Sequence, residues 1–120
     1  MLKYCIIIIK EDMLDKEIEK IKEIIKKQVF ENNLSIKKII LFGSRAGKHY
    51  APDSDFDILI VIEQDIDIDK KILLFKNINN ALASEFIPSD IIIKTEREFT
   101  SLSDKIGTVT YTAVKEGIAI

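Results

Sequence analysis

The chain has 120 residues, of which 47% are hydrophobic and 32% charged, a balance typical of a single small folded domain over residues 1–120. Its formal net charge of −2 provides no overall attraction for nucleic acid, so DNA and RNA are disfavoured as partners. One cysteine cannot form an internal disulfide and no apolar segment is long enough to span a bilayer, so we expect a cytoplasmic protein.

The first half of the chain alternates apolar runs with one amphipathic segment. The β-branched run Tyr4–Ile9 predicts a strand. From Asp12 to Asn33 apolar residues recur every three or four positions, which predicts a helix that ends at the two asparagines. Ile36–Phe42 and Phe56–Ile62 are predicted strands, and the second is so apolar that both of its faces should be covered. The predicted stripe of the helix consists of Leu14, Ile18, Ile21, Ile25 and Val29.

The second half predicts a helix, a strand and a last helical region. Asp69 is the expected N-cap of a helix that runs to about Phe86, and Pro88 breaks it. Asp90–Lys94 reads as a strand, Thr95 or Ser103 could cap the final helical region, and Gly117 would end it. The order favours a small α/β or α+β domain, with a mixed sheet flanked by helices on at least one face. The predicted stripe of the middle helix is Ile72, Phe75, Ile78 or Asn79, Leu82 and Phe86.

A glycine turn with a lysine follows the strand that ends at Phe42. It is not a P-loop, because Gly43 and Gly47 have three residues between them instead of four. His49, after Lys48, also lacks the hydroxyl that would hold Mg²⁺, and the Rossmann pattern of glycines is absent. The turn still suits a phosphate group, since glycine lets the backbone approach closely and a following serine, Ser44, adds a hydroxyl donor.

Alternating aspartates supply the second half of a candidate site. In "DSDFD", Asp55 and Asp57 project from the same face if the strand begins there. Two carboxylates on one face repel each other, and a divalent cation bound through oxygen atoms relieves that repulsion. The segment "EQDIDIDK" has the same spacing without the glycine turn, so we interpret Asp65, Asp67 and Asp69 as a solvated loop and a helix cap.

The segment "KIILFGSRAGKHYAPDSDFDILIV" resembles the minimal nucleotidyltransferase (MNT) family of the DNA polymerase beta-type superfamily. The later strand in "IPSDIIIK" looks like the one that carries the superfamily's third carboxylate, which here is Asp90, and "YTAVKEGIAI" is similar to the family's ending. The resemblance covers about residues 12–120 and implies a small nucleotidyltransferase fold.

The resemblance also implies roles for individual residues. Gly43 and Ser44 would hold the triphosphate of ATP, and Asp55 and Asp57 would bind two Mg²⁺ ions. Asp90 would help to bind the ion that activates the acceptor hydroxyl, and would serve as its base.

The glycine turn contributes further candidates and one departure from the family. Arg45 and Lys48 are candidate phosphate contacts, with a plain surface charge as the alternative for each. The family usually reads Gly-Ser-Arg-Ala-Arg-Gly, whereas this chain has Gly47 and Lys48 at the last two positions. A lysine cannot copy the bidentate grip of an arginine. His49 and Tyr50 lie near the site by sequence alone.

By the same resemblance, the expected function is transfer of AMP from Mg-ATP to a hydroxyl of a partner protein. Proteins of this kind are typically antitoxins that silence a HEPN-domain ribonuclease toxin. The chain has no room for the acceptor-binding domain of larger relatives, so we expect the acceptor to come from outside. One alternative is a non-catalytic module that neutralises its partner by contact. Another is a nucleotidyltransferase for a small-molecule acceptor.

Overall fold

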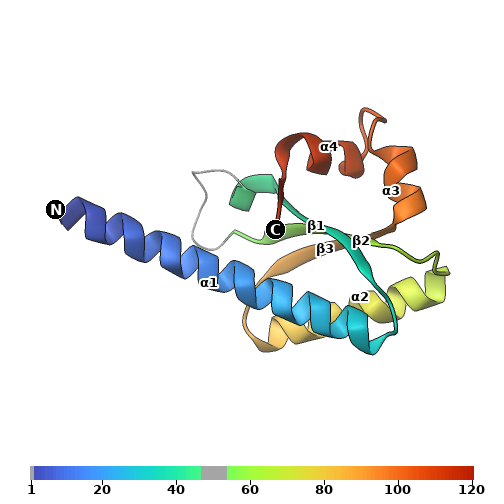
Figure 1. Cartoon of the computed structure of the whole chain (residues 1–120), viewed down its shortest axis with the longest axis horizontal. Coiled ribbons are helices and arrows are strands. Elements are labelled where there is room, and N and C mark those ends of the chain that lie inside the picture. The colour runs from blue at the N-terminus through green and yellow to red at the C-terminus, as the bar shows by residue number, and fades with distance from the viewer. Residues whose placement is uncertain (1, 47–53) are drawn as a thin grey trace.

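The computed structural model describes the backbone of residues 2–46 and 54–120, and the side chains of residues 16–46 and 54–120. Four α-helices, one 3-10 helix and four strands follow one another in these parts of the chain (Figure 1). The elements are α1 (Leu2–Glu31), β1 (Ile36–Phe42), η1 (Gly43–Ala46), β2 (Phe56–Ile62), α2 (Ile68–Ser84), β3 (Ser89–Thr95), α3 (Glu96–Leu102), α4 (Val109–Glu116) and β4 (Ile118–Ala119).

The four strands form one mixed sheet in the order β3-β2-β1-β4. β1 pairs with β2 and with β4 in antiparallel fashion, whereas β2 and β3 are parallel and α2 connects them. The two strands predicted at Ile36–Phe42 and Phe56–Ile62 are confirmed at the predicted bounds. The predicted α/β class with a mixed, helix-flanked sheet is therefore confirmed.

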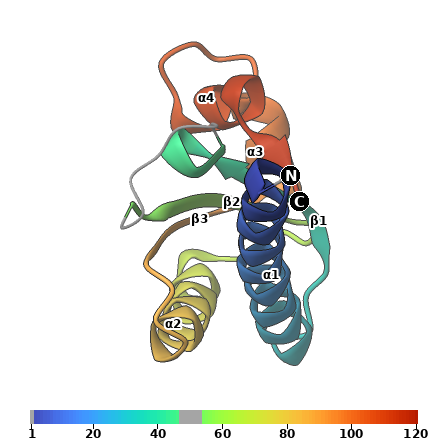
Figure 2. The ribbon, with the colours of Figure 1, turned by 90° about the vertical axis from the view of Figure 1, so that its left-hand side faces the viewer.

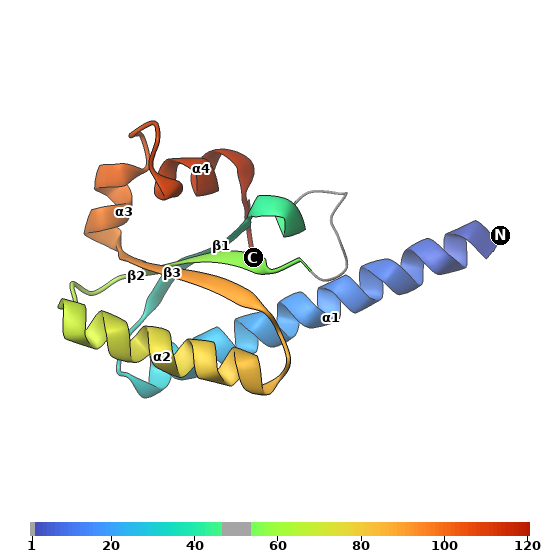
Figure 3. The same cartoon turned by 180° about the vertical axis from the view of Figure 1, so that it is seen from behind.

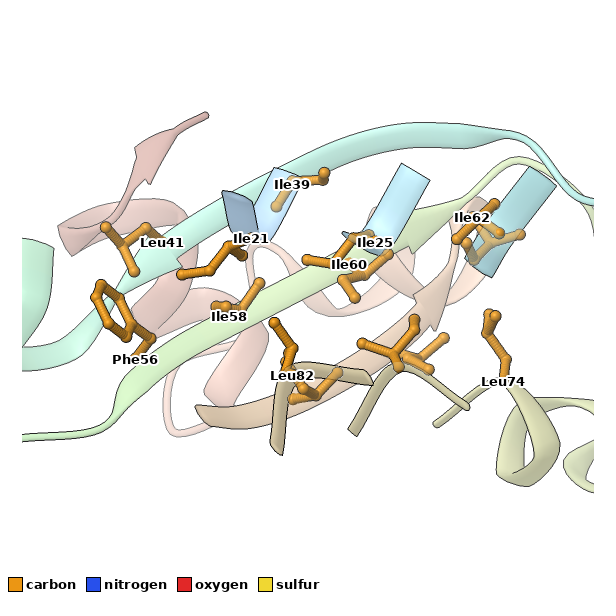
Figure 4. Close-up of a cluster of buried hydrophobic side chains, with 14 of the residues drawn as sticks. Ile21, Ile25, Ile39, Leu41, Phe56, Ile58, Ile60, Ile62, Leu74 and Leu82 are labelled. Atoms are coloured by element: carbon orange, nitrogen blue, oxygen red, sulfur yellow. The ribbon is translucent and has the colours of Figure 1, made fainter. Parts of the chain in front are cut away.

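Helices cover both faces of the sheet, and each face has its own core. Figure 2 shows α1 and α2 on one side of the sheet, and α3 and α4 on the other. On the first side, one cluster contains Ile21 and Ile25 of α1, Leu74 and Leu82 of α2, and Ile58, Ile60 and Ile62 of β2 (Figure 4). On the second side, a smaller cluster contains Ile40, Phe42, Leu59, Val61 and Ala113. Burial on both faces explains why β2 is an almost unbroken apolar run.

The first helix is longer than the sequence pattern predicts. Residues 4–9 belong to α1, so the strand predicted at Tyr4–Ile9 is wrong. A short apolar run without periodicity fits a helix as well as a strand, and here the helix that follows extends through it. Ile21, Ile25 and Val29 are buried as predicted, and Asn33 has the left-handed backbone expected where the helix ends. Within the described residues, no helix is long and apolar enough to cross a membrane.

The second helix differs from its prediction at both ends and on its buried face. Asp67, not Asp69, is the N-cap, because its side chain accepts a hydrogen bond from the Lys70 N–H at 2.8 Å. The helix ends at Ser84, and Phe86 lies beyond it in a left-handed conformation with 92% of its surface exposed. The buried residues are Leu74, Ile78 and Leu82, whereas Ile72 and Phe75 are exposed.

The last helical region is two helices. Of the two predicted caps, Thr95 is the N-cap of α3, with a complete capping box. Ser103 is instead the C-cap of that helix. A second cap, Thr108, begins α4, and Gly117 ends it as predicted. The short strand β4 then returns to β1, and it adds an edge that the sequence pattern does not predict.

Candidate active site at the end of the sheet

The pairing of three strands brings the predicted glycine turn and aspartates to one end of the sheet. Phe42, the last residue of β1, pairs with Asp57 of β2, and Asp57 pairs with Asp90 of β3. Gly43 follows Phe42 directly and opens η1. Because neighbouring strands lie about 4.8 Å apart, this register places Gly43, Asp57 and Asp90 side by side.

Both strand aspartates lie on the face of the sheet that α3 and α4 cover. Asp57 shares its face with Leu59, which packs in the smaller core cluster, whereas Phe56 and Ile58 point into the larger one. Asp90 likewise shares its face with Ile92, two residues further along β3, and Ile92 packs against the smaller cluster. Phe56 and Ile58 therefore point away from the aspartates, as the alternation of side chains along a strand requires.

The backbone of Gly43 lies directly against the carboxylate of Asp57. Gly43 has a φ of +69°, and a Cβ atom there would contact Asp57 Oδ2 and lie 3.0 Å from Asp57 Cγ. A side chain at this position would therefore clash with the carboxylate. Gly43 and Ser44 are both exposed, so a ligand can reach this turn next to Asp57.

The aspartates interact electrostatically. Partial burial raises the pKa of Asp57 above its ordinary value, and the negative charges of Asp90 and Asp55 raise it further. Asp55 is exposed just before β2 and also lines a cleft of about 470 Å³ with residues at the end of α2 and the start of β3. The structure thus places Asp55 and Asp90 close enough to Asp57 for their charges to act on it, and a cation would relieve this repulsion.

A divalent cation fits this group by its chemistry. Carboxylate oxygens are the ligands that Mg²⁺ prefers, and the missing side chain of Gly43 lets the Asp57 carboxylate lie against the glycine turn. In the described parts of the chain, no three carboxylates are close enough together to form a metal site as they stand. The protein alone therefore provides the negative charge, and the assignment of Asp55, Asp57 and Asp90 as metal ligands stays a prediction.

Arg45 is part of the structural support of the site. Only 8% of its surface is exposed, so the alternative of a plain surface charge is wrong. Its Nε donates a hydrogen bond to the carbonyl oxygen of Ser54 at 2.9 Å, and its guanidinium lies 4.4 Å from the centre of the Phe56 ring. These contacts connect the turn after β1 to the segment that leads into β2. Its predicted contact with phosphate stays a prediction.

Replacement of Arg45 by Ala is expected to lower the free energy of unfolding by about 2 kcal/mol, because a buried hydrogen bond and a cation–π contact are lost. Urea unfolding followed by circular dichroism measures the effect. Arg97→Ala is the matched control, since Arg97 is 83% exposed and pairs with Asp65 at the surface at 3.0 Å. The control should cost less than about 1 kcal/mol. Equal losses in the two variants would contradict the supporting role of Arg45.

The other candidates of the sequence are separate from this end of the sheet or lie outside the described residues. Asp67 caps α2 and Asp65 pairs with Arg97, which confirms the interpretation of that aspartate run as a loop and a cap. Three candidates, Lys48, His49 and Tyr50, lie outside the described residues. The burial of Arg45 was not predicted from the sequence. The available signal was an arginine two residues after Gly43 together with an aromatic residue, Phe56, at the start of β2.

A family model matches most of the chain. The family model described as "Polymerase beta, Nucleotidyltransferase" matches residues 19–120. A comparison with curated proteins found no significant match.

Two solved structures are similar to the chain. One is a mutant of the toxin–antitoxin pair MntA–HpeT, with 16% identity and a TM-score of 0.48. The match covers 78% of this chain and 66% of that one. The other is the tri-AMPylated Shewanella oneidensis HEPN toxin in complex with MNT antitoxin, with 21% identity and a TM-score of 0.49. That match covers 84% of this chain and 69% of the solved one.

Proposed function

Because the chain belongs to the polymerase beta nucleotidyltransferase family, we propose that it transfers AMP from Mg-ATP to a hydroxyl group of a partner protein. We further propose that the partner is a HEPN ribonuclease toxin, and that this chain is the antitoxin that silences it. The finer proposal rests on the resemblance of its Gly-Ser and Asp-x-Asp segment to minimal nucleotidyltransferases. The HEPN toxin in the solved complex from Shewanella oneidensis carries three AMP groups, and that is the kind of product expected here.

One observation carries the proposal of a transferase site. The exposed backbone of Gly43 lies against the carboxylate of Asp57, and Asp90 is the neighbour of Asp57 on the next strand. This arrangement would provide a surface for phosphate and a group of carboxylates for cations at the same place. Either feature alone is common in proteins, whereas their contact is what a metal–triphosphate complex requires.

The residues have distinct roles in the proposed reaction. The Gly43 backbone and the Ser44 hydroxyl would bind the triphosphate and hold its α-phosphorus near the carboxylates. Asp55, Asp57 and Asp90 would hold two Mg²⁺ ions, which supply neutralisation of phosphate charge and activation of the acceptor hydroxyl. The acceptor oxygen forms a bond to the α-phosphorus, pyrophosphate leaves, and the hydroxyl proton passes to Asp90.

The test is intact mass spectrometry of the co-expressed partner, encoded by the neighbouring gene. We expect the partner to gain the mass of one or more AMP groups with the wild-type chain. The gain should be absent with the Asp55→Asn/Asp57→Asn double variant. Asp65→Asn/Asp69→Asn is the matched control, because it also removes two carboxylate charges, away from the site, and should leave the modification intact.

An unmodified partner that still forms a stable complex with the wild-type chain would contradict the transferase proposal. It would favour the non-catalytic antitoxin, whose double aspartate variant should still neutralise the toxin. Transfer of AMP to an aminoglycoside by the isolated chain, with no change in the partner's mass, would favour the small-molecule alternative.

A further inference from the structure

The outer edge of β3 has backbone groups without strand partners in the described sheet, where β3 is the terminal strand next to β2. The N–H of Phe56 donates to the carbonyl of Pro88 at 2.9 Å, so the backbone groups of even-numbered residues in β3 point toward β2. Those of Ile91 and Ile93 therefore point outward. Thr95 agrees with this alternation, since its N–H points away from β2 and donates to Glu98 Oε1 of its own helix cap at 3.0 Å.

An apolar surface on α2 lies beside this edge. Figure 3 shows β3 along the near edge of the sheet with α2 beneath it. Ile68, Ile72 and Phe75 of α2 are 65%, 45% and 39% exposed. Together with Lys71 and Ile93 they line a hollow of about 180 Å³ between the helix and the strand. A strand edge with a neighbouring apolar hollow is a surface that can accept another strand.

The charges of β3 are complementary to those of a second β3 in antiparallel orientation. In the sequence SDIIIKT, Asp90 and Lys94 lie at equal distances on either side of Ile92. When two copies pair about Ile92, each Asp90 lies opposite Lys94 of the other copy, and each Ile91 lies opposite Ile93. We propose that the chain forms a two-fold symmetric dimer through β3, in which the two sheets join into one.

The backbone directions fit this register. The backbone N–H and C=O groups of Ile91 and Ile93 point outward, so each Ile91–Ile93 pair across the dimer would exchange two hydrogen bonds. Asp90 and Lys94 then form non-hydrogen-bonded pairs, in which the opposite side chains lie closest, with Cβ atoms about 5 Å apart. Lys94 forms no ion pair within the described chain, although its charge helps to lower the pKa of Glu98. It is therefore available to Asp90 of the second copy.

The two-fold axis also brings the apolar surfaces of α2 together. The axis is perpendicular to the sheet, so the α2 helices of both copies lie on the same side and next to each other. Their exposed Ile68, Ile72 and Phe75 would then be covered, as an isologous interface requires. The second copy would also place its Lys94 beside Asp90, at the border of the candidate active site. Asp90 belongs to both the dimer edge and the proposed transfer site, but association of the chain can be measured without nucleotide transfer.

Sedimentation equilibrium of the full chain over a range of concentrations tests the proposal. We expect a dimer for the wild type. Lys94→Glu and Asp90→Lys should each weaken it by about tenfold or more, because each variant places like charges opposite each other twice. An equimolar mixture of the two variants should restore the dimer, since both pairs across the mixed interface are then of opposite charge. Circular dichroism verifies that each variant is folded.

A second pair of variants tests the helix surface. Ile72→Glu should weaken the dimer, whereas Val114→Glu on α4 should not, although both residues are 45% exposed. A wild-type chain that stays monomeric at high concentration would overturn the proposal. So would a dimer that Lys94→Glu and Ile72→Glu leave unchanged, because its interface would lie elsewhere. If the chain is a monomer and these substitutions abolish only its binding to the toxin, the edge binds that partner, and the dimer proposal is also overturned.

Discussion

Replacement of Asp57 by Asn is expected to lower the rate of nucleotide transfer on the order of 10³-fold without lowering the stability of the chain. The loss of activity follows from its proposed place between Asp55 and Asp90, where it would bind both ions. The retained stability follows from its electrostatics. Partial burial and the charges of Asp90 and Asp55 raise the pKa of Asp57, so its ionised form is disfavoured in the folded chain.

The sign of this effect gives the pH dependence. A carboxyl group whose pKa is raised by folding destabilises the protein once it is ionised. This cost is absent below its ordinary pKa of 3.8 and is fully present above the raised pKa of the folded state. The Tm of Asp57→Asn should therefore equal or exceed that of the wild type at pH 7, and the advantage should vanish below pH 3.8.

Two measurements on the same preparations verify this prediction. Thermal unfolding at several pH values gives the difference in Tm, and transfer of labelled AMP to the partner gives the rate. The Asp65→Asn/Asp69→Asn variant should keep its activity, because those residues lie in the loop and first turn of α2. The electrostatic explanation would be contradicted if the Tm of Asp57→Asn, compared with that of the wild type, were lower at pH 7 than at low pH.

Replacement of Gly43 by Ala should be the most destabilising change at the site, with a loss of about 3 kcal/mol in the free energy of unfolding. One part is the strain of a left-handed backbone, which costs about 1–2 kcal/mol for a residue with a side chain. The other part is the contact of the new Cβ with the Asp57 carboxylate. Activity should be lost as well, because the methyl group would displace that carboxylate from its position.

Gly107 provides a matched control for this substitution. It also has a positive φ, of +93°, but a Cβ there would have no atom within 4 Å, so Gly107→Ala measures backbone strain alone. Chemical unfolding of both variants gives the difference, which we expect to favour Gly107→Ala by about 1–2 kcal/mol. Adding Asp57→Ala to Gly43→Ala should recover part of the loss. Equal losses in the two glycine variants would mean that the close contact with Asp57 has no energetic consequence.

The sequence predicts best where local pattern and burial agree. β1 and β2 have the predicted bounds because long β-branched runs between polar turns have few alternatives. The residues 4–9 were wrongly predicted as a strand because an apolar run carries no period of its own. In α2 the cap at Asp67 shifts the helix by two residues, and packing then buries Leu74 in place of Ile72.

The candidate site was predictable as a set of residues but not as an arrangement. The spacing of Gly43, Asp55 and Asp57 is visible in the chain, and Asp90 is visible by the family resemblance. Their contact depends on the register of three strands, which the sequence pattern does not fix. The burial of Arg45 on Phe56 depends on the same packing. β4 was missed because a strand of two residues exists only through its pairing with β1.

Isothermal titration of the chain with Mg-ATP is the most direct test of a joint metal and triphosphate site. We expect the wild type to bind, and the affinity to fall by at least about tenfold for Asp57→Asn, because a ligand of the ions is lost. The Asp65→Asn/Asp69→Asn variant should bind as the wild type does, and removal of Mg²⁺ should weaken binding in both. Equal affinity of the wild type and folded Asp57→Asn, or binding of ATP that is independent of Mg²⁺, would contradict the assignment of this site.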